Sequence, residues 1–163
     1  FMIKNRLPTL DHEKYLRFAI ELAYNSRKEG NHPFGAILVG TNGEILLKAM
    51  NTFGIKGDST SHAERNLMSL ASIKYDPEFL KNCTMYASAE PCAMCSGAVY
   101  WAGIGRVVYG MAEKDLKKMI GPHPENLTMD LPCRKVLTSG QRHIEVVGPL
   151  LEDESSRVHI GFW

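Results

Sequence analysis

The sequence lacks the features that mark membrane, fibrous and disordered proteins. It has no apolar run near the roughly 20 residues that cross a bilayer, and Lys4, Arg6 and Pro8 interrupt segment 1–10, so the apolar block of a signal peptide is missing. It has no internal repeat and no linker rich in Gly, Pro and Ser. These absences predict a cytoplasmic protein without a membrane partner, folded as a single domain over residues 2–163.

The sequence also lacks an excess of charge of either sign. Nineteen Lys and Arg residues stand against 18 Asp and Glu, which gives a net charge of +1. So balanced a chain has no broad positive field for DNA, RNA or an acidic membrane, and a nucleic-acid partner would need a local basic patch. With 44% hydrophobic and 23% charged residues over 163 positions, the composition is that of a globular protein with a sizeable core.

Short periodic segments alternate along the chain. Apolar residues recur at three and four between 11 and 27, which predicts an amphipathic helix, and Asn42-Gly43 between β-prone runs at 34–39 and 44–50 predicts a hairpin. A polar loop is expected over 51–61. Further helices are expected over 62–73, 92–102, 112–120 and 150–159, and strands over 84–89, 106–110 and 143–147. The region 121–139 is ambiguous because its prolines limit it to short helical pieces. This order predicts an α/β fold with a mixed sheet covered by helices on both faces.

The four cysteines are few, and in a chain without an export signal they are better explained as thiols or metal ligands than as disulfides. Cys92 and Cys95 are three apart and follow Pro91, so both sulfurs would lie on one face at a helix N-terminus. The positive end of the helix favours thiolates there. Taken alone, this C-x-x-C fits a zinc site, a redox dithiol or chance.

A second element upstream favours the metal. His62-Ala63-Glu64 opens the preceding predicted helix, and His62 with two thiolates makes a three-ligand zinc site with one position left for water, as in catalytic sites. Because residues two apart in a regular helix point to opposite sides, His62 and Glu64 can share a site only where the helix begins. Taken singly, His62 is a surface residue and Glu64 an acid that complements the helix dipole. Combined with P-C-x-x-C, H-x-E is the signature of zinc-dependent nucleobase deaminases.

Further segments extend this match: Pro33-Phe34-Gly35-Ala36, Asn51, Glu90 to Ala98 and Arg106 to Gly110. With them, residues 10–112 resemble the cytidine deaminase superfamily, in its branch of guanine, cytosine and tRNA adenosine deaminases. The resemblance implies a three-layer α/β/α sandwich around a mixed five-stranded sheet, a homodimer, and Zn²⁺ held by His62, Cys92 and Cys95. Beyond residue 112 the chain follows none of these subfamilies closely.

The resemblance also implies roles for single residues. Glu64 would take a proton from the water that zinc activates and deliver protons to the ring nitrogen and the departing amine. Asn51 aligns with an asparagine that holds the base, Phe34 and Trp101 look like the aromatic residues that flank guanine, and Ala63 belongs to the substrate-binding set. From the residues alone, Phe34 is equally a core residue of the first strand, Trp101 a buried helix residue and Asn51 a turn residue.

The other histidines and the last two aromatic residues lie outside this pattern. His32 adjoins the loop before Phe34, which is weak ground for a role near the site, and Phe162 and Trp163 are expected to be covered, in a pocket or at a subunit interface. We expect surface or ordinary polar roles for the remaining histidines, which are His12, His123, His143 and His159. His12 is expected on the solvent face of the first helix.

These observations favour one function and leave others open. The favoured function is a hydrolytic deaminase that replaces an exocyclic amine of a small nucleobase or nucleoside by a carbonyl and releases ammonia, with guanine first because of the segments around Phe34 and Trp101. A tRNA-specific adenosine deaminase is the alternative, and it is disfavoured because the last predicted helix opens with three acids, at 152–154, instead of basic residues. A cytosine deaminase and a non-catalytic zinc or redox module are the further alternatives.

Overall fold

The computed structural model describes residues 7–163, so the expected start of the domain at residue 2 and most of segment 1–10 lie outside the described residues. The strands are β1 (Gly35–Val39), β2 (Ile45–Met50), β3 (Thr84–Ala89), β4 (Arg106–Met111) and β5 (Glu145–Val147). The longer helices are α1 (His12–Lys28), α3 (Ala63–Lys74), α5 (Ala93–Ala102) and α6 (Glu113–Ile120). The short helices are α2 (Phe53–Lys56), α4 (Pro77–Leu80), α7 (Cys133–Leu137) and α8 (Glu152–Arg157).

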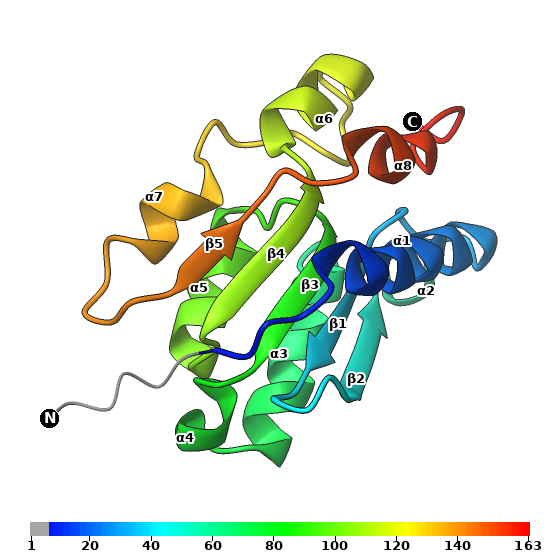
Figure 1. The fold of residues 1–163 in the computed structure, drawn as a ribbon. Helices are drawn as coiled ribbons and strands as arrows, with labels where there is room; N and C mark the ends of the chain where they lie inside the picture. The colour runs from blue at the N-terminus through cyan, green and yellow to red at the C-terminus, as the bar shows by residue number, and fades with distance from the viewer. Residues whose placement is uncertain (1–6) are drawn as a thin grey trace, which may run out of the picture.

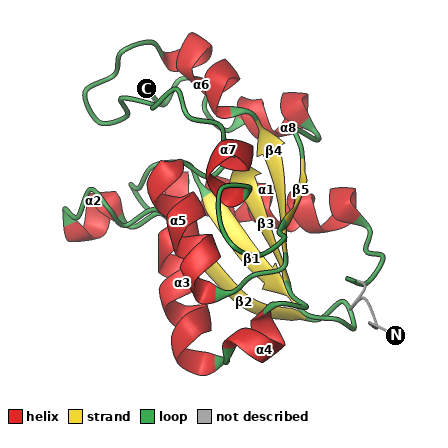
Figure 2. Ribbon diagram, turned by 90° about the vertical axis from the view of Figure 1, so that its left-hand side faces the viewer, coloured by secondary structure: helices red, strands yellow, loops and turns green. Residues whose placement is uncertain are grey.

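The strands form one mixed sheet in the order β2-β1-β3-β4-β5. β1 runs antiparallel to both β2 and β3, whereas β3, β4 and β5 run parallel to one another. Helices α1 and α8 cover one face of the sheet, and α3 and α5 lie side by side on the other (Figures 1 and 2). The predicted α/β/α sandwich with a five-stranded sheet is therefore confirmed.

The burial of each strand depends on its place in the sheet. Every residue of β1, β3 and β4 is buried because helices cover both faces of these strands, while the edge strands β2 and β5 are only partly buried. Gly35 lets α1 approach β1 closely, since a Cβ there would lie 2.5 Å from the carbonyl oxygen of Ala19. Within residues 7–163, no helix combines the length and the hydrophobicity that a membrane span needs.

Several expectations need correction. The polar loop at 51–61 contains the single-turn helix α2, and the last helix is shorter than the expected 150–159. The region 121–139 holds the five-residue helix α7 after Pro132, which is a short helical piece as expected. His12 is not on the solvent face, because its Nδ1 lies 2.7 Å from the hydroxyl of the buried Tyr86. A single turn is too short for periodicity to reveal, so α2 could not be predicted from the pattern.

Candidate metal centre and its cavity

The three predicted metal ligands lie together where two helices begin. His62 and Cys92 are the N-caps of α3 and α5, and Cys95 lies in the first turns of α5. The Nδ1 atom of His62 is 3.5 Å from the sulfur of Cys92 and 3.6 Å from that of Cys95. Within residues 7–163, this metal group (His62, Cys92, Cys95) is the one set of at least three His, Cys, Asp or Glu residues with ligand atoms close enough to hold an ion.

The geometry of the metal group fits zinc. Tetrahedral bonds of about 2.0 to 2.1 Å to nitrogen and about 2.3 Å to sulfur separate the two ligand atoms by roughly 3.6 Å, which matches both observed separations. A hydrogen bond from the Cys95 thiol lowers the pKa of Cys92 to about 4, so Cys92 supplies a thiolate. Two sulfurs and one imidazole leave a fourth position for water or a substrate, as in catalytic zinc sites.

Glu64 lies in the same cavity as the metal group although it is only two residues from His62. His62 has extended backbone angles (φ −66°, ψ 151°) and stands just before the regular helix, so the side chains of His62 and Glu64 are not forced to opposite sides. Glu64 is 5% exposed, and burial raises the pKa of its carboxyl to about 7. His62 therefore lies where the helix begins, which is the position that a site shared by His62 and Glu64 requires.

The cavity that joins these groups is small, about 50 Å³. One part of its lining comes from the loops and helix starts between the end of α1 and the start of α5, and the other part from α6 and the segment after it. Together its walls are made by His32, Phe34, Asn51, His62, Glu64, Glu90, Cys92, Glu113, Leu116, Glu125, Asn126 and Thr128. We call Glu113, Leu116, Glu125, Asn126 and Thr128 the α6 wall.

Strand topology explains why the α6 wall meets the metal group. Parallel strands β3 and β4 end side by side, with Ala89 paired to Met111, so the residues that follow each strand emerge at one edge of the sheet. β3 leads through Glu90 to Cys92, and β4 leads to Glu113. The carboxylate of Glu90 accepts the backbone N–H of Glu113 at 2.9 Å and that of Cys133 at 2.8 Å, which ties the two parts together.

Asn51 is held in place by a network on both sides of it. The amide nitrogen of Asn66 on α3 donates to the carbonyl of Met50 at 3.0 Å and to the hydroxyl of Thr52 at 3.1 Å. The side-chain oxygen of Asn51 accepts the N–H of Phe53 at 2.9 Å. Asn51 therefore lines the cavity as predicted, but its acceptor is already engaged, and its amide nitrogen is the part left to bind a ligand.

Two predicted substrate contacts are not found in this cavity. Trp101 is 83% exposed on the outer side of α5, and Ala63 is fully buried in the core cluster, so neither side chain lines the cavity. That they contact substrate stays a prediction. Helix geometry explains where Trp101 lies: it is more than two turns beyond Cys92 on a helix whose opposite side faces the sheet.

Aromatic residues from the end of the chain pack against two residues of the cavity wall, His32 and Phe34. Trp163 is half-buried and packs against His32 and Phe34, with ring centroids 5.0 and 6.2 Å away. Its indole N–H donates to Nδ1 of His159 at 3.0 Å. The expectation that Phe162 and Trp163 are covered is confirmed, and His32 proves to be a cavity residue.

Sequence reasoning missed most of the α6 wall. Glu113 has the pattern of an ordinary first-turn acid, and Glu125 to Thr128 lie in the proline-limited region without periodicity. One usable signal existed, because Glu113 follows a buried strand parallel to the one before Cys92, and ligands collect at the carboxyl ends of such strands.

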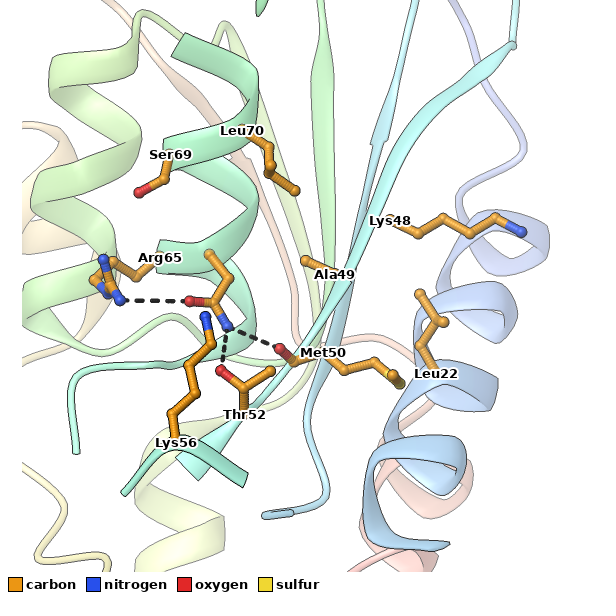
Figure 3. Close-up of a pocket in the computed structure, with 10 residues that line it drawn as sticks. Leu22, Lys48, Ala49, Met50, Thr52, Lys56, Arg65, Ser69 and Leu70 are labelled. Carbon is orange, nitrogen blue, oxygen red and sulfur yellow. Dashed lines mark hydrogen bonds between the residues drawn. The ribbon is translucent and has the colours of Figure 1, made fainter. Parts of the chain in front are cut away.

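A larger groove, about 510 Å³, lies away from the metal group along β2 and α3. Figure 3 shows its lining, which includes Leu22, Met50 and Leu70 but none of the metal-binding residues. Its size alone does not make it the reaction site, because a reaction site also needs convergent ionisable groups.

Comparison with known proteins agrees with this site. Residues 9–111 match the family model described as the cytidine and deoxycytidylate deaminase zinc-binding region. A probable cytosine deaminase of Schizosaccharomyces pombe is 42% identical over 149 residues, covering 91% of this chain and 90% of that protein. A guanine deaminase of Bacillus subtilis is 36% identical over 107 residues, covering 65% and 68%.

The fold agrees as well. The structure of a guanine deaminase from Nitrosomonas europaea superposes with a TM-score of 0.74 at 25% identity, covering 94% of this chain and 84% of that one. Both the metal group and Glu64 lie inside the matched residues 9–111, whereas the α6 wall lies beyond them. On this evidence the chain belongs to the cytidine and deoxycytidylate deaminase family of zinc-dependent enzymes.

Proposed function

We propose that this protein is a hydrolytic deaminase of a small amino-substituted nucleobase, with guanine as the first substrate to test. The observation that carries the proposal is the buried carboxyl of Glu64 in one cavity with the metal group. A purely structural zinc site has no use for a proton-carrying group beside its open position. This argues against the non-catalytic zinc module.

The residues of the site have separate roles in the proposed reaction. His62, Cys92 and Cys95 would hold zinc, which when bound supplies Lewis-acid activation of water. The Glu64 carboxylate would accept one proton of the attacking water and deliver it to a ring nitrogen. It would then take the second proton, from the hydroxyl group newly attached to the ring carbon, and pass it to the departing amine, so that ammonia leaves and a carbonyl remains.

The remaining lining indicates what the substrate is. Phe34 offers an aromatic face for stacking and the Asn51 amide nitrogen offers a hydrogen-bond donor. The described lining includes four carboxyl side chains (Glu64, Glu90, Glu113, Glu125) and neither Lys nor Arg. Phosphates would be repelled, so this lining supports a small uncharged base and disfavours tRNA.

Cytosine is the second candidate. The probable cytosine deaminase of S. pombe aligns over 90% of its length, which includes the residues of the α6 wall region. With Trp101 outside the cavity, part of the ground for favouring guanine is removed, so both bases belong in the same assay.

We also propose a homodimer. Leu70, Ile73 and Trp101 are exposed large apolar residues on α3 and α5, which lie side by side on one face of the sheet. Exposed apolar side chains on two neighbouring helices suit contact with a second copy of the chain. Light scattering coupled to gel filtration should give twice the chain mass, and a monomer would refute the dimer without affecting the proposed reaction. A cytoplasmic location stays a prediction.

The function is tested on zinc-loaded protein with guanine, cytosine, their nucleosides and tRNA, by ammonia release and identification of the product. We expect turnover of a free base, little changed between low and moderate salt, because no phosphate contact contributes. Faster inosine formation in tRNA with steep salt dependence would overturn the proposal. The absence of ammonia from every substrate would also refute it.

A further inference from the structure

Glu113 is a buried carboxyl that the proposed reaction does not use. It begins α6 directly after β4, it is 8% exposed, and its side chain lines the cavity of the metal group. Its Oε2 atom has no hydrogen-bond partner among residues 7–163. A buried acceptor without a partner is destabilising, so its presence in a cavity points to a ligand that supplies the missing donor.

The other carboxyls near the metal group differ from Glu113 in bonding or in burial. Glu90 accepts the backbone N–H groups of Glu113 and Cys133, so it is committed to the fold. Glu125 is half exposed, so water can reach its carboxylate, and Nε2 of His32 at 3.6 Å is too far for a hydrogen bond. Glu113 is therefore the buried carboxyl of the α6 wall that lacks a partner.

Two ordinary roles for Glu113 do not fit its surroundings. It is not a metal ligand, because it is absent from the set whose ligand atoms lie within 4.8 Å of one another. It is also not needed as a cap, since α6 has no side-chain cap hydrogen bond and the N–H of Glu113 is satisfied by Glu90. The role that remains for the Glu113 carboxyl is contact with a ligand bound in the cavity.

The orientation of a bound base follows from the reaction. The carbon that loses its amine must lie beside Glu64 and the metal group, so other edges of the ring meet the rest of the lining, which includes the α6 wall. In a nucleoside the sugar replaces the proton on one ring nitrogen, and that N–H is available only in the free base.

We propose that Glu113 is a specificity-determining residue that accepts a hydrogen bond from this ring N–H and thereby selects free bases over nucleosides. The inference rests on the proposed function and deepens it by naming the substrate class. Either oxygen of a carboxyl can accept an N–H, so a free base satisfies Oε2. A base alkylated at that nitrogen leaves Oε2 without a partner and brings a carbon against it.

The test compares each base with its derivative methylated at the nitrogen that would carry the sugar: guanine with 9-methylguanine, and cytosine with 1-methylcytosine. The zinc-loaded wild-type protein should favour the free base of the pair that it deaminates. Glu113→Ala should raise KM for the free base roughly tenfold, the usual range for a lost buried hydrogen bond, while KM for the methylated base stays level or falls. The kcat for the free base should change less than KM.

Two further variants separate recognition from structure. Glu113→Gln keeps an oxygen acceptor and should retain part of the preference, and it replaces the alanine variant if that one melts early or loses zinc. Asp115→Ala, an acid in the same helix turn that does not line the cavity, should leave the preference unchanged. An Ala variant that keeps the full preference for the free base, or a wild type without one, would overturn the inference.

Failure of the proposed function can be told apart from failure of this inference. If the wild type releases ammonia from no base, calorimetric binding of guanine and cytosine replaces kinetics as the readout. Weaker binding of the free base to Glu113→Ala, with binding of the methylated base unchanged, would still support the role of Glu113. Equal binding to both proteins, or binding to neither, would overturn it.

Discussion

Two sides of one cavity differ in how they are built. The metal group and Glu64 come from two short motifs at the starts of α3 and α5, inside the matched residues 9–111. The α6 wall comes from a helix and an irregular segment beyond that match. The chemistry is thus carried by local sequence, and the shape of the opposite side by residues that tertiary structure brings in.

This difference has a functional consequence. A group at a helix start is positioned by a few neighbouring residues, so the reaction can stay the same while the chain beyond β4 varies. Substrate choice then depends on what α6 and residues 121–131 place against the ring. The comparison predicts that changes on the metal side abolish turnover, whereas changes on the α6 wall alter which base is accepted.

The largest effect is expected from removing a metal ligand. Cys92→Ala should lose zinc and fall to background activity, because two ligands do not hold the ion in place of three. Elemental analysis checks this against Cys83→Ala, a buried cysteine outside the cavity, which should keep one zinc per chain. Zinc retained at full occupancy in Cys92→Ala would remove Cys92 from the metal group.

The next effect concerns Glu64. Glu64→Gln should keep the fold and the zinc but lose a factor of about 10² to 10⁴ in kcat, the range typical of a positioned acid and base. Steady-state ammonia release measures it, with zinc content determined on the same sample. Turnover near the wild-type rate would mean that another group moves the protons.

Aromatic contacts should give a smaller effect that separates the cavity from the outer face of α5. Phe34→Leu keeps an apolar side chain against the core but removes the stacking face, and it should raise KM by an amount equal to about 1 to 3 kcal/mol of base stacking. Trp101→Ala should leave KM unchanged and weaken the dimer instead, since its ring is 83% exposed in the subunit. Equal rises in KM for both variants would place Trp101 in the site of a neighbouring subunit.

The last expected effect is on stability, at His159, whose ring packs against Phe34 and Trp163. Burial lowers the pKa of His159 to about 4, below its usual 6.5. The unfolded chain therefore binds a proton more readily than the folded one between these values, so this residue's contribution is complete above pH 6.5 and is lost as the pH falls towards 4, at up to about 1.4 kcal/mol per pH unit.

Denaturant unfolding from pH 7 to pH 4 tests this for the wild type and His159→Gln. The difference in the free energy of unfolding between the two should shrink as the pH falls. A difference that stays constant over this range would show that His159 does not titrate in the folded protein as its burial implies.

Much of the fold could be predicted because its signals are local. The long helix α1, the Asn-Gly hairpin and the buried strands β3 and β4 each carry a periodic pattern over several residues. The metal group was also predictable, since its spacing needs only two helix starts. Single-turn helices such as α2 give no periodicity, and they were missed for that reason.

The rest of the site could not be predicted because it depends on contacts between distant segments. Glu113 is an ordinary first-turn acid until the parallel pairing of β3 and β4 places it beside Cys92. Trp101 lies on the helix that begins with the Cys92 and Cys95 motif, but the direction of its side chain depends on which side of α5 faces the sheet. His32 enters the cavity because α1 ends early enough for residues 31–34 to turn towards it.

A crystal structure of the zinc-loaded protein with a non-reactive analogue of the preferred base tests the two-sided account most directly. We predict one zinc on His62, Cys92 and Cys95, the amine-bearing carbon beside Glu64, the ring against Phe34, and a ring N–H on the Glu113 carboxyl. A base bound in the groove between β2 and α3, or bound at the metal with its N–H turned away from the α6 wall, would contradict it.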